Sequence, residues 1–191
     1  ENTEETYKQY PYAFQFEISY ELVGNKLLNT YIVKNKDEKQ MYFGVGGHPG
    51  FNVPFETGIT FEDYYLEFSG GAGEGCAAGS PVRIDFSPTC FLTGNDKEYE
   101  LEKGNRISLH HDMFDEDAIV LKNAPDTVTL KSDQGERYVR VRYPEMPYIG
   151  FWHAVKTDAP YICIEPWSSL PSRQDVVEDL ARERAKEKSG L

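Results

Sequence analysis

Short segments in which apolar and polar residues alternate recur along most of this chain, and they constrain its fold more than any other feature. Phe14–Tyr20 alternates in this way, and a period of two residues is typical of a strand with one buried face. A Gly24-Asn25 pair separates it from a second apolar segment over 26–34, as in a hairpin. Similar segments follow, separated by turn residues at the spacing of a sandwich: 41–45, 64–68, 82–86, 106–110, 118–121, 127–131, 138–143, 149–154 and 161–164.

This pattern predicts an all-β fold, a large antiparallel β-sandwich. The exception is 175–188, which is rich in Ala, Arg, Glu and Lys and indicates a helix. The glycine-rich stretch Gly70–Gly75 lacks the strand-before, helix-after context of a nucleotide fingerprint, so we interpret it as a loop. At 191 residues the chain fits one domain with a core large enough for stability.

The composition argues against several classes of partner. The formal net charge is −12, whereas nucleic-acid binding requires clustered Lys and Arg. No apolar run approaches the ~20 residues that cross a bilayer, and the first residues do not resemble a secretory leader. The three cysteines, Cys76, Cys90 and Cys163, lack metal-type spacing and are interpreted as reduced thiols. We therefore expect a cytoplasmic monomer or homodimer that binds neither nucleic acid nor membranes.

The first segment with residues suited to proton transfer is Gly46-Gly47-His48-Pro49-Gly50-Phe51-Asn52. Its glycines allow close backbone approach, Pro49 fixes the turn, and Asn52 offers a hydrogen-bonding amide. An imidazole held in this way can donate or accept a proton near neutral pH. A lone histidine is usually structural, however, and both interpretations stay open from the residues alone.

The second such segment is Cys163-Ile164-Glu165-Pro166-Trp167. Glu165 leaves an apolar strand and is either its first solvated residue or a partly buried acid. Partial burial would raise the pKa of Glu165 and make it a better base at neutral pH. Trp167 favours this second interpretation, because an aromatic ring beside a carboxylate can hold the face of a sugar.

A third cluster covers His110 to Asp117 and combines two histidines with several carboxylates. Its acidic positions do not follow the calcium-loop pattern and it lacks the glycine of that loop, so we do not expect a metal there. Asp117 precedes the apolar 118–121, and we interpret it as projecting from the start of a strand to hydrogen-bond a hydroxyl. Trp152 lies in an alternating strand, where a core position is the more frequent role and a ligand platform the alternative.

Five stretches together carry a family resemblance: 43–54 around His48, 163–167 around Glu165, 117–121, 10–14 and 27–35. They resemble the aldose 1-epimerase (galactose mutarotase-like) family, and its lactose-operon-associated branch most of all. The resemblance runs from about Tyr10 to Trp167. It implies a large β-sandwich with a sugar site on one sheet, and it implies no metal and no cofactor.

The resemblance also implies roles for individual residues. Glu165 would be the general base and His48 the general acid, with Asp117 binding sugar hydroxyls. Asn52, Trp152 and Trp167 are expected to complete the sugar site. The family also has an upstream segment with an arginine and a second histidine, and a closing C-terminal strand. We therefore expect 1–191 to be one domain of this kind that lacks strands at both ends.

The resulting hypothesis is an aldose 1-epimerase that interconverts the anomers of a free hexose by acid–base ring opening. Two alternatives stay open. A hexose-6-phosphate 1-epimerase would need basic residues to hold the phosphate, for which Arg140 and Arg142 are candidates. A non-catalytic carbohydrate-binding module could use the same fold.

Overall fold

The structure is a computed structural model that describes residues 1–70, 80–173 and 175–177. These residues form two compact units, which meet in the sequence between Val45 and Gly46. The sequence predicted a single domain over 1–191, and that assignment stays a prediction.

The first unit consists of one short helix and one hairpin. Helix α1 (Glu4–Gln9) was not predicted, although Thr3 caps it by accepting a hydrogen bond from the backbone N–H of Thr6. Strands β1 (Phe14–Val23) and β2 (Lys26–Asn35) pair antiparallel along their full length. Gly24 has a φ of 62° in the two-residue turn, a conformation that glycine adopts without steric cost.

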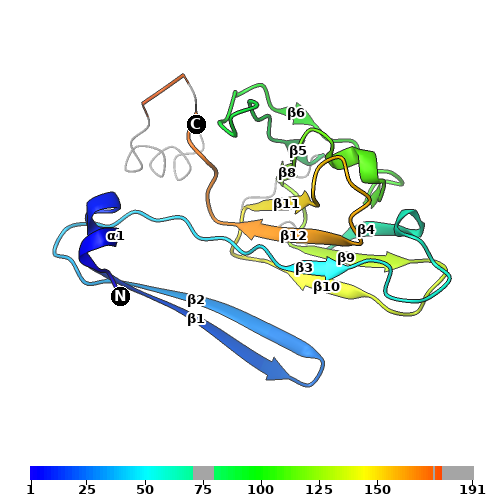
Figure 1. The fold of residues 1–191 in the computed structure, drawn as a ribbon, viewed down its shortest axis with the longest axis horizontal. Coiled ribbons are helices and arrows are strands. Elements are labelled where there is room, and N and C mark those ends of the chain that lie inside the picture. Colours follow the sequence, from blue (N-terminus) through cyan, green and yellow to red (C-terminus); the bar gives the residue numbers. More distant parts are fainter. Residues whose placement is uncertain (71–79, 174, 178–191) are drawn as a thin grey trace. The chain divides into compact units, whose positions relative to one another are not determined.

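The second unit contains two antiparallel sheets (Figure 1). The four-stranded sheet has the order β10-β9-β4-β7 and the six-stranded sheet the order β3-β12-β11-β8-β5-β6. Short 3₁₀ helices lie at Phe61–Asp63 and His111–Phe114. The strands are β3 (Gly50–Asn52), β4 (Tyr64–Ser69), β5 (Val82–Arg83), β6 (Lys97–Glu98), β7 (Arg106–Ser108), β8 (Ile119–Lys122), β9 (Thr127–Ser132), β10 (Val139–Arg142), β11 (Tyr148–Trp152) and β12 (Tyr161–Trp167).

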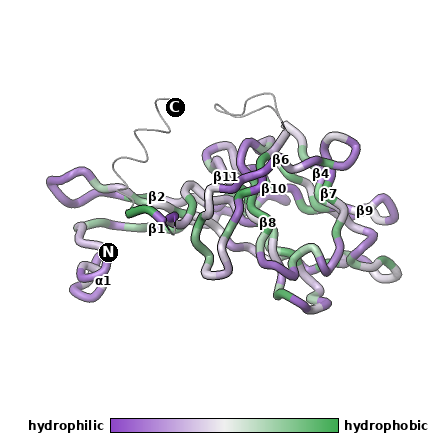
Figure 2. Tube along the Cα trace, turned by 90° about the horizontal axis from the view of Figure 1, so that it is seen from above, coloured by the Kyte–Doolittle hydropathy of each residue, from purple (hydrophilic) through white to green (hydrophobic). Residues whose placement is uncertain are grey.

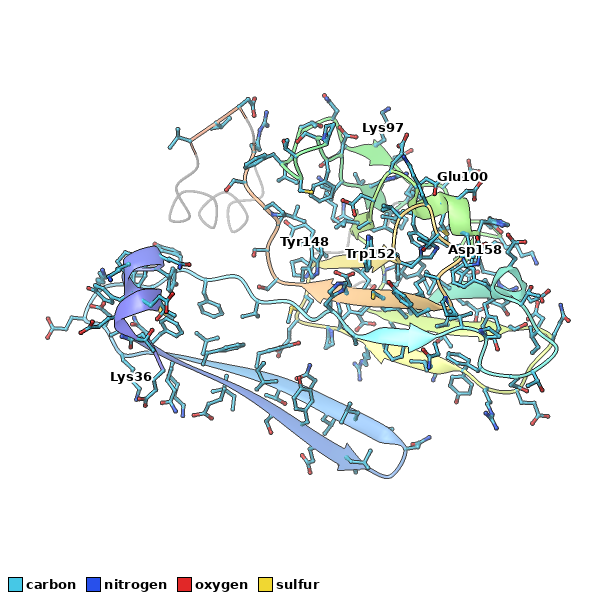
Figure 3. The ribbon with its side chains drawn as sticks, in the orientation of Figure 1. Lys36, Lys97, Glu100, Tyr148, Trp152 and Asp158 are labelled. Atoms are coloured by element: carbon cyan, nitrogen blue, oxygen red, sulfur yellow. The ribbon has the colours of Figure 1, made fainter. Side chains whose placement is uncertain are left out.

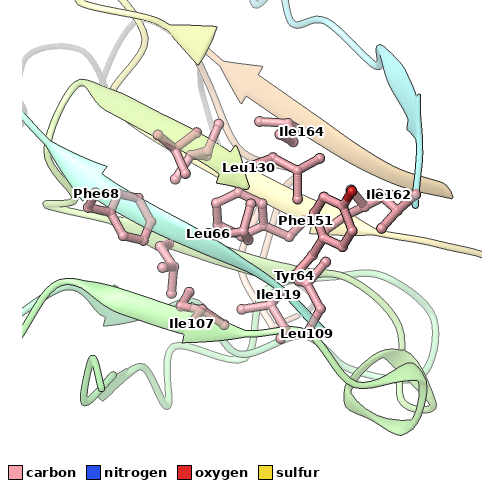
Figure 4. Close-up of a cluster of buried hydrophobic side chains, with 14 of the residues drawn as sticks. Tyr64, Leu66, Phe68, Ile107, Leu109, Ile119, Leu130, Phe151, Ile162 and Ile164 are labelled. Atoms are coloured by element: carbon pink, nitrogen blue, oxygen red, sulfur yellow. The ribbon is translucent and has the colours of Figure 1, made fainter. Parts of the chain in front are cut away.

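The core lies between these two sheets (Figure 4). Alternate residues of the central strands enter it, as the pleat of a strand requires. β4 and β9 supply Leu66 and Leu130 from one sheet, and β11 and β12 supply Phe151 and Ile164 from the other; all four are fully buried. Figure 2 shows β8 as a hydrophobic segment inside this unit and the loops at its edge as largely hydrophilic.

The predicted fold class is confirmed, because nearly all regular structure in the described residues is antiparallel strand. One predicted strand, over 41–45, is wrong: these residues form no ladder. β3 and β6 were not predicted, since segments of two or three residues are too short to show alternation. Most of the predicted helix at 175–188 and most of Gly70–Gly75 lie outside the described residues. No helix in the described part of the chain could cross a membrane.

The position of Phe151 between the sheets leads to a stability prediction. Its ring is fully buried and meets Phe68 edge to face, with 6.0 Å between ring centroids. We expect Phe151→Ala to lower the free energy of unfolding by about 3–5 kcal/mol, measured by urea denaturation. Phe91 is 41% exposed, so the matched change Phe91→Ala should cost about 0.5 kcal/mol or less. Equal losses in both variants would contradict the assignment of the core.

Candidate active site

Backbone pairing brings the His48 segment alongside β12. The Gly47 N–H donates to the Pro166 carbonyl at 3.0 Å, and the Ile164 N–H donates to the Pro49 carbonyl at 3.1 Å. These two bonds bracket Glu165 on one strand and His48 on the other. The sequence predicted that the strand ends at Ile164, but β12 continues through Trp167. Pro166 has no N–H to donate, yet its carbonyl still pairs with the His48 segment.

Alternation along β12 determines which residues face the site. Ile162 and Ile164 enter the core between the sheets, so Cys163 and Glu165 lie on the opposite face of the six-stranded sheet. There His48 Nδ1 lies 2.6 Å from Glu165 Oε1. The two partners differ in exposure, because the His48 side chain is 59% exposed and the Glu165 side chain only 7%. The structure thus joins a buried carboxylate to a solvent-exposed imidazole.

Burial raises the pKa of Glu165 above that of an ordinary glutamate. The neighbouring His48 and a hydrogen bond from the Trp167 side chain act in the opposite direction, and the negative charge of Asp117 adds to the rise. Loss of hydration dominates, so the pKa of this carboxyl stays raised despite the imidazole contact. Such a carboxylate holds a proton more tightly than a solvated one and is a stronger base near neutral pH.

Two tryptophans border the pair. The Trp152 ring centroid lies 5.6 Å from that of His48, and Trp167 contacts Glu165 through its indole N–H, the one donor of that side chain. Trp152 is half-buried on β11, on the face opposite Phe151. It therefore does not have the core position that is the more frequent role of a tryptophan in an alternating strand. Figure 3 shows Trp152 and Tyr148 on the same strand. The aromatic rings therefore lie on the face that carries the acid–base pair.

Two glycines make room for these groups. Gly150 pairs with Glu165 in the sheet, so no side chain from β11 stands beside the carboxylate. Gly46 forms an isolated bridge with Trp167, and a Cβ atom there would lie 2.6 Å from the Trp167 ring. The close packing of Trp167 against the backbone thus depends on a glycine at position 46.

Asp117 and Asn52 are the two other polar residues that were expected at this site. Asp117 precedes β8, has a φ of 103° and accepts a hydrogen bond from the Ala118 N–H at 2.8 Å. Its charge acts on Glu165, which places its carboxylate within electrostatic reach of the pair. Asn52 is exposed on β3 opposite Tyr161, and the register puts both side chains on the Glu165 face.

Cys163 joins the centre without having been predicted there. Its Sγ atom lies within 4.8 Å of ligand atoms of both His48 and Glu165. Burial, together with the charge of Glu165, raises the pKa of this thiol to about 11, so it is held protonated and is a poor nucleophile. The sequence contained one signal for it: Cys163 precedes Glu165 by two residues, and a period of two puts both on one face.

Other residues from the sequence analysis lie elsewhere. Arg140 and Arg142 are on β10 of the four-stranded sheet, where Arg140 donates to Thr129 Oγ1 at 3.2 Å. They pair with Thr129 and Thr127 rather than with the core positions of β9, so they lie on the outer face of that sheet. The structure therefore does not bring them to the His48–Glu165 pair.

The acidic cluster is a separate feature. His111 and Asp112, with His110 and Asp115, line a hollow of about 730 Å³ whose other walls include Lys156 and Asp158. The His111 ring stacks on Phe61 and its Nδ1 lies 3.2 Å from Nε2 of the fully buried His153. These histidines thus fasten the 3₁₀ helix to the end of β11.

The contact between Gly46 and Trp167 leads to a prediction. Gly46→Ala should displace the indole and weaken its hydrogen bond to Glu165, at a cost of about 1–3 kcal/mol in stability. The chain has two tryptophans, so the indole N–H resonance of Trp167 can be followed by ¹⁵N NMR after assignment with Trp167→Phe. We expect that resonance to shift strongly.

Gly50→Ala is the matched control for this change. Neither glycine has a positive φ, and a Cβ atom at position 50 would meet Cys163 Sγ at an ordinary 3.6 Å. This variant should leave the Trp167 resonance nearly in place. If Gly46→Ala moves the resonance no further than Gly50→Ala does, the described packing is incorrect.

Comparisons with known proteins identify the family of this chain. The family model described as aldose 1-epimerase matches residues 1–178. The chain is 33% identical over 163 residues to the chromosomal and plasmid LacX proteins of Lactococcus lactis subsp. lactis, covering 84% of this chain. It spans about half, 52%, of the length of these relatives.

Two solved structures are also similar. One is a galactose mutarotase related enzyme from Lactobacillus acidophilus, with a TM-score of 0.80 and 33% identity over 94% of this chain and 58% of that chain. The other is a galactose mutarotase-like protein from Lactobacillus casei, with a TM-score of 0.81 and 27% identity over 94% of this chain and 60% of that chain. The resemblance seen in the sequence motifs is therefore confirmed: this chain belongs to the aldose 1-epimerase family.

Proposed function

We propose that the protein is an aldose 1-epimerase that interconverts the α and β anomers of a free hexose, with Glu165 as general base and His48 as general acid. The observation that carries this proposal is the 2.6 Å contact between His48 Nδ1 and Glu165 Oε1. The names of the solved relatives, galactose mutarotase related and galactose mutarotase-like, support galactose as the first sugar to test.

The chemistry needs a base and an acid that lie very close together. The ring of an aldose opens when the anomeric hydroxyl loses its proton and the ring oxygen gains one. Both oxygens are bonded to the same carbon, so the groups that exchange protons with them must be near neighbours. A carboxylate and an imidazole in direct contact meet this requirement, since each can turn from its partner to one of the two oxygens.

In the proposed reaction, Glu165 takes the proton of the anomeric hydroxyl while the bond between the anomeric carbon and the ring oxygen breaks. The electron pair of that bond stays on the ring oxygen, which receives a proton from the imidazolium of His48. The free aldehyde then rotates about one carbon–carbon bond. Ring closure on its other face returns both protons to their donors. Each positioned group contributes a rate factor on the order of 10²–10⁴.

The surrounding residues suit a polar ring with apolar faces. Trp152, 5.6 Å from His48 between ring centroids, offers an apolar surface for a sugar ring. Trp167 keeps the carboxylate oriented through its indole N–H. In this proposal Asp117 and Asn52 accept and donate hydrogen bonds to hydroxyls further from the reacting carbon. No residue in this set needs a metal or an organic cofactor for the proposed steps.

A free hexose is preferred over a hexose 6-phosphate for a structural reason. The two arginines considered for a phosphate, Arg140 and Arg142, belong to the four-stranded sheet. The acid–base pair belongs to the six-stranded sheet. The proposal therefore takes the uncharged sugar as substrate, and a comparison of galactose with galactose 6-phosphate in one assay tests that choice.

The direct test of this function is substitution of the base. Glu165→Gln keeps the shape of the side chain but removes its ability to take a proton, so anomer exchange should slow by about 10²–10⁴-fold. The measurement is exchange NMR or polarimetry on freshly dissolved α-galactose, with the uncatalysed rate subtracted.

Glu98→Gln is the control for this substitution. Glu98 is exposed on β6, at the far edge of the same sheet, and its loss should leave the rate unchanged. Exchange in Glu165→Gln at the parental rate would show that another group is the base. Sugar binding by calorimetry without any exchange in the parent protein would instead favour a non-catalytic binding module.

The raised pKa of Glu165 leads to a pH prediction. The base must be ionised, so kcat/KM should fall as the pH drops through the pKa of Glu165 in the folded protein. Because burial raises that pKa, the fall should begin at a higher pH than an ordinary glutamate would give. Asp117→Asn removes a negative charge that helps to raise the pKa of Glu165. The fall in kcat/KM on the acid side should therefore move to lower pH in Asp117→Asn, whereas Glu98→Gln should leave it in place. A shift of this fall to higher pH in Asp117→Asn would contradict the assigned effect of Asp117 on Glu165.

A further inference from the structure

We propose that Cys163, His48 and Glu165 form a binding site for a zinc ion, and that zinc competes with sugar for this centre. The competition rests on the function proposed above, whereas the binding of the ion does not. The ligand atoms would be Cys163 Sγ, one ring nitrogen of His48 and one carboxylate oxygen of Glu165, which all lie within 4.8 Å of one another.

These three side chains converge because of how β12 is paired. Cys163 and Glu165 are two residues apart on one strand and share a face, and His48 comes from the segment that runs beside them. Gly50 pairs with Cys163, and a Cβ atom at that position would stand 3.6 Å from the sulfur. The glycine therefore leaves the sulfur uncovered by a side chain from β3.

The donor set suits zinc in number and type. One sulfur, one imidazole nitrogen and one carboxylate oxygen are all common zinc ligands, and three protein ligands with an open fourth position are typical of accessible zinc sites. In a tetrahedral arrangement the ligand atoms would stand about 3.3–3.6 Å apart, which follows from metal–ligand distances of about 2.0–2.3 Å. In the structure the imidazole and carboxylate atoms are 2.6 Å apart and all three ligand atoms lie within 4.8 Å of one another, so binding would need the imidazole and carboxylate to move apart by less than about 1 Å.

The protonated thiol does not prevent binding, because a coordinating Zn²⁺ deprotonates a thiol outright and the proton leaves to solvent. Entry of the ion requires an accessible ligand, and His48 provides it with a side chain that is 59% exposed. Binding would replace the hydrogen bond between His48 and Glu165 by two bonds to the metal. The lone pairs of His48 and Glu165 that accept protons in the proposed reaction would then be bonded to the metal. Zinc should therefore inhibit anomer exchange.

The binding test uses Co²⁺ as a spectroscopic substitute for Zn²⁺. The chain has three cysteines, so a variant with Cys76→Ser and Cys90→Ser retains Cys163 as its only thiol. Titration of this variant with Co²⁺ should produce a near-ultraviolet thiolate-to-cobalt charge-transfer band at one ion per chain, and added Zn²⁺ should abolish it. Further substitution Cys163→Ser should remove the band. His48→Gln should weaken metal binding by more than about tenfold, the lower end of the range for the loss of an outer-shell partner.

The inhibition test compares rates within each variant. The ratio of the anomer-exchange rate with and without micromolar Zn²⁺ should fall well below one in the Cys76→Ser, Cys90→Ser variant, recover on addition of a chelator, and stay near one after Cys163→Ser. Absence of the cobalt band, or its persistence without Cys163, would overturn the metal site. A normal band in a protein that does not exchange the anomers of any sugar would leave the site standing and overturn the proposed function instead.

Discussion

The pairing of the His48 segment with β12 is the interaction on which the rest of the site depends. Two backbone hydrogen bonds, from Gly47 to Pro166 and from Ile164 to Pro49, hold segments that lie more than a hundred residues apart in the sequence. The same strand inserts Ile162 and Ile164 into the core between the sheets. Any shift of β12 by one residue would exchange its two faces. Core packing therefore fixes Glu165 opposite His48, and the chemistry gains its precision from hydrophobic burial elsewhere in the sheet.

Much of this arrangement could be predicted from the sequence, because alternation carries the necessary information. The period of two in 161–165 contains the information that Cys163 and Glu165 share a face, whereas the residues alone left open whether Glu165 is solvated or partly buried. What alternation cannot show is a contact between distant segments: the family resemblance implied roles for His48 and Glu165, and their direct contact is seen only in the structure. The strand β3, only three residues long, lacks the length for a periodic signal.

Other features were hidden for different physical reasons. The extension of β12 through Pro166 contradicts the usual rule that proline ends a strand, and it is possible because the carbonyl of Pro166 alone is used in pairing with Gly47. Arg140 and Arg142 appeared as possible phosphate ligands because sequence alternation shows that two residues share a face but not which sheet they belong to. That assignment requires the strand order, which depends on contacts across the whole unit.

The unequal exposure of His48 and Glu165 suits the proposed proton cycle. Ring opening starts only from an ionised carboxylate and a protonated imidazole, yet burial of Glu165 by itself favours the neutral acid. If both groups were equally buried, desolvation would favour transfer of the proton to the carboxylate and leave a neutral pair that cannot begin the reaction. The His48 side chain is 59% exposed, so only the carboxylate of this contact carries a large cost of desolvation. Burial of Glu165 raises its strength as a base, while His48 stays open to solvent on its exposed side.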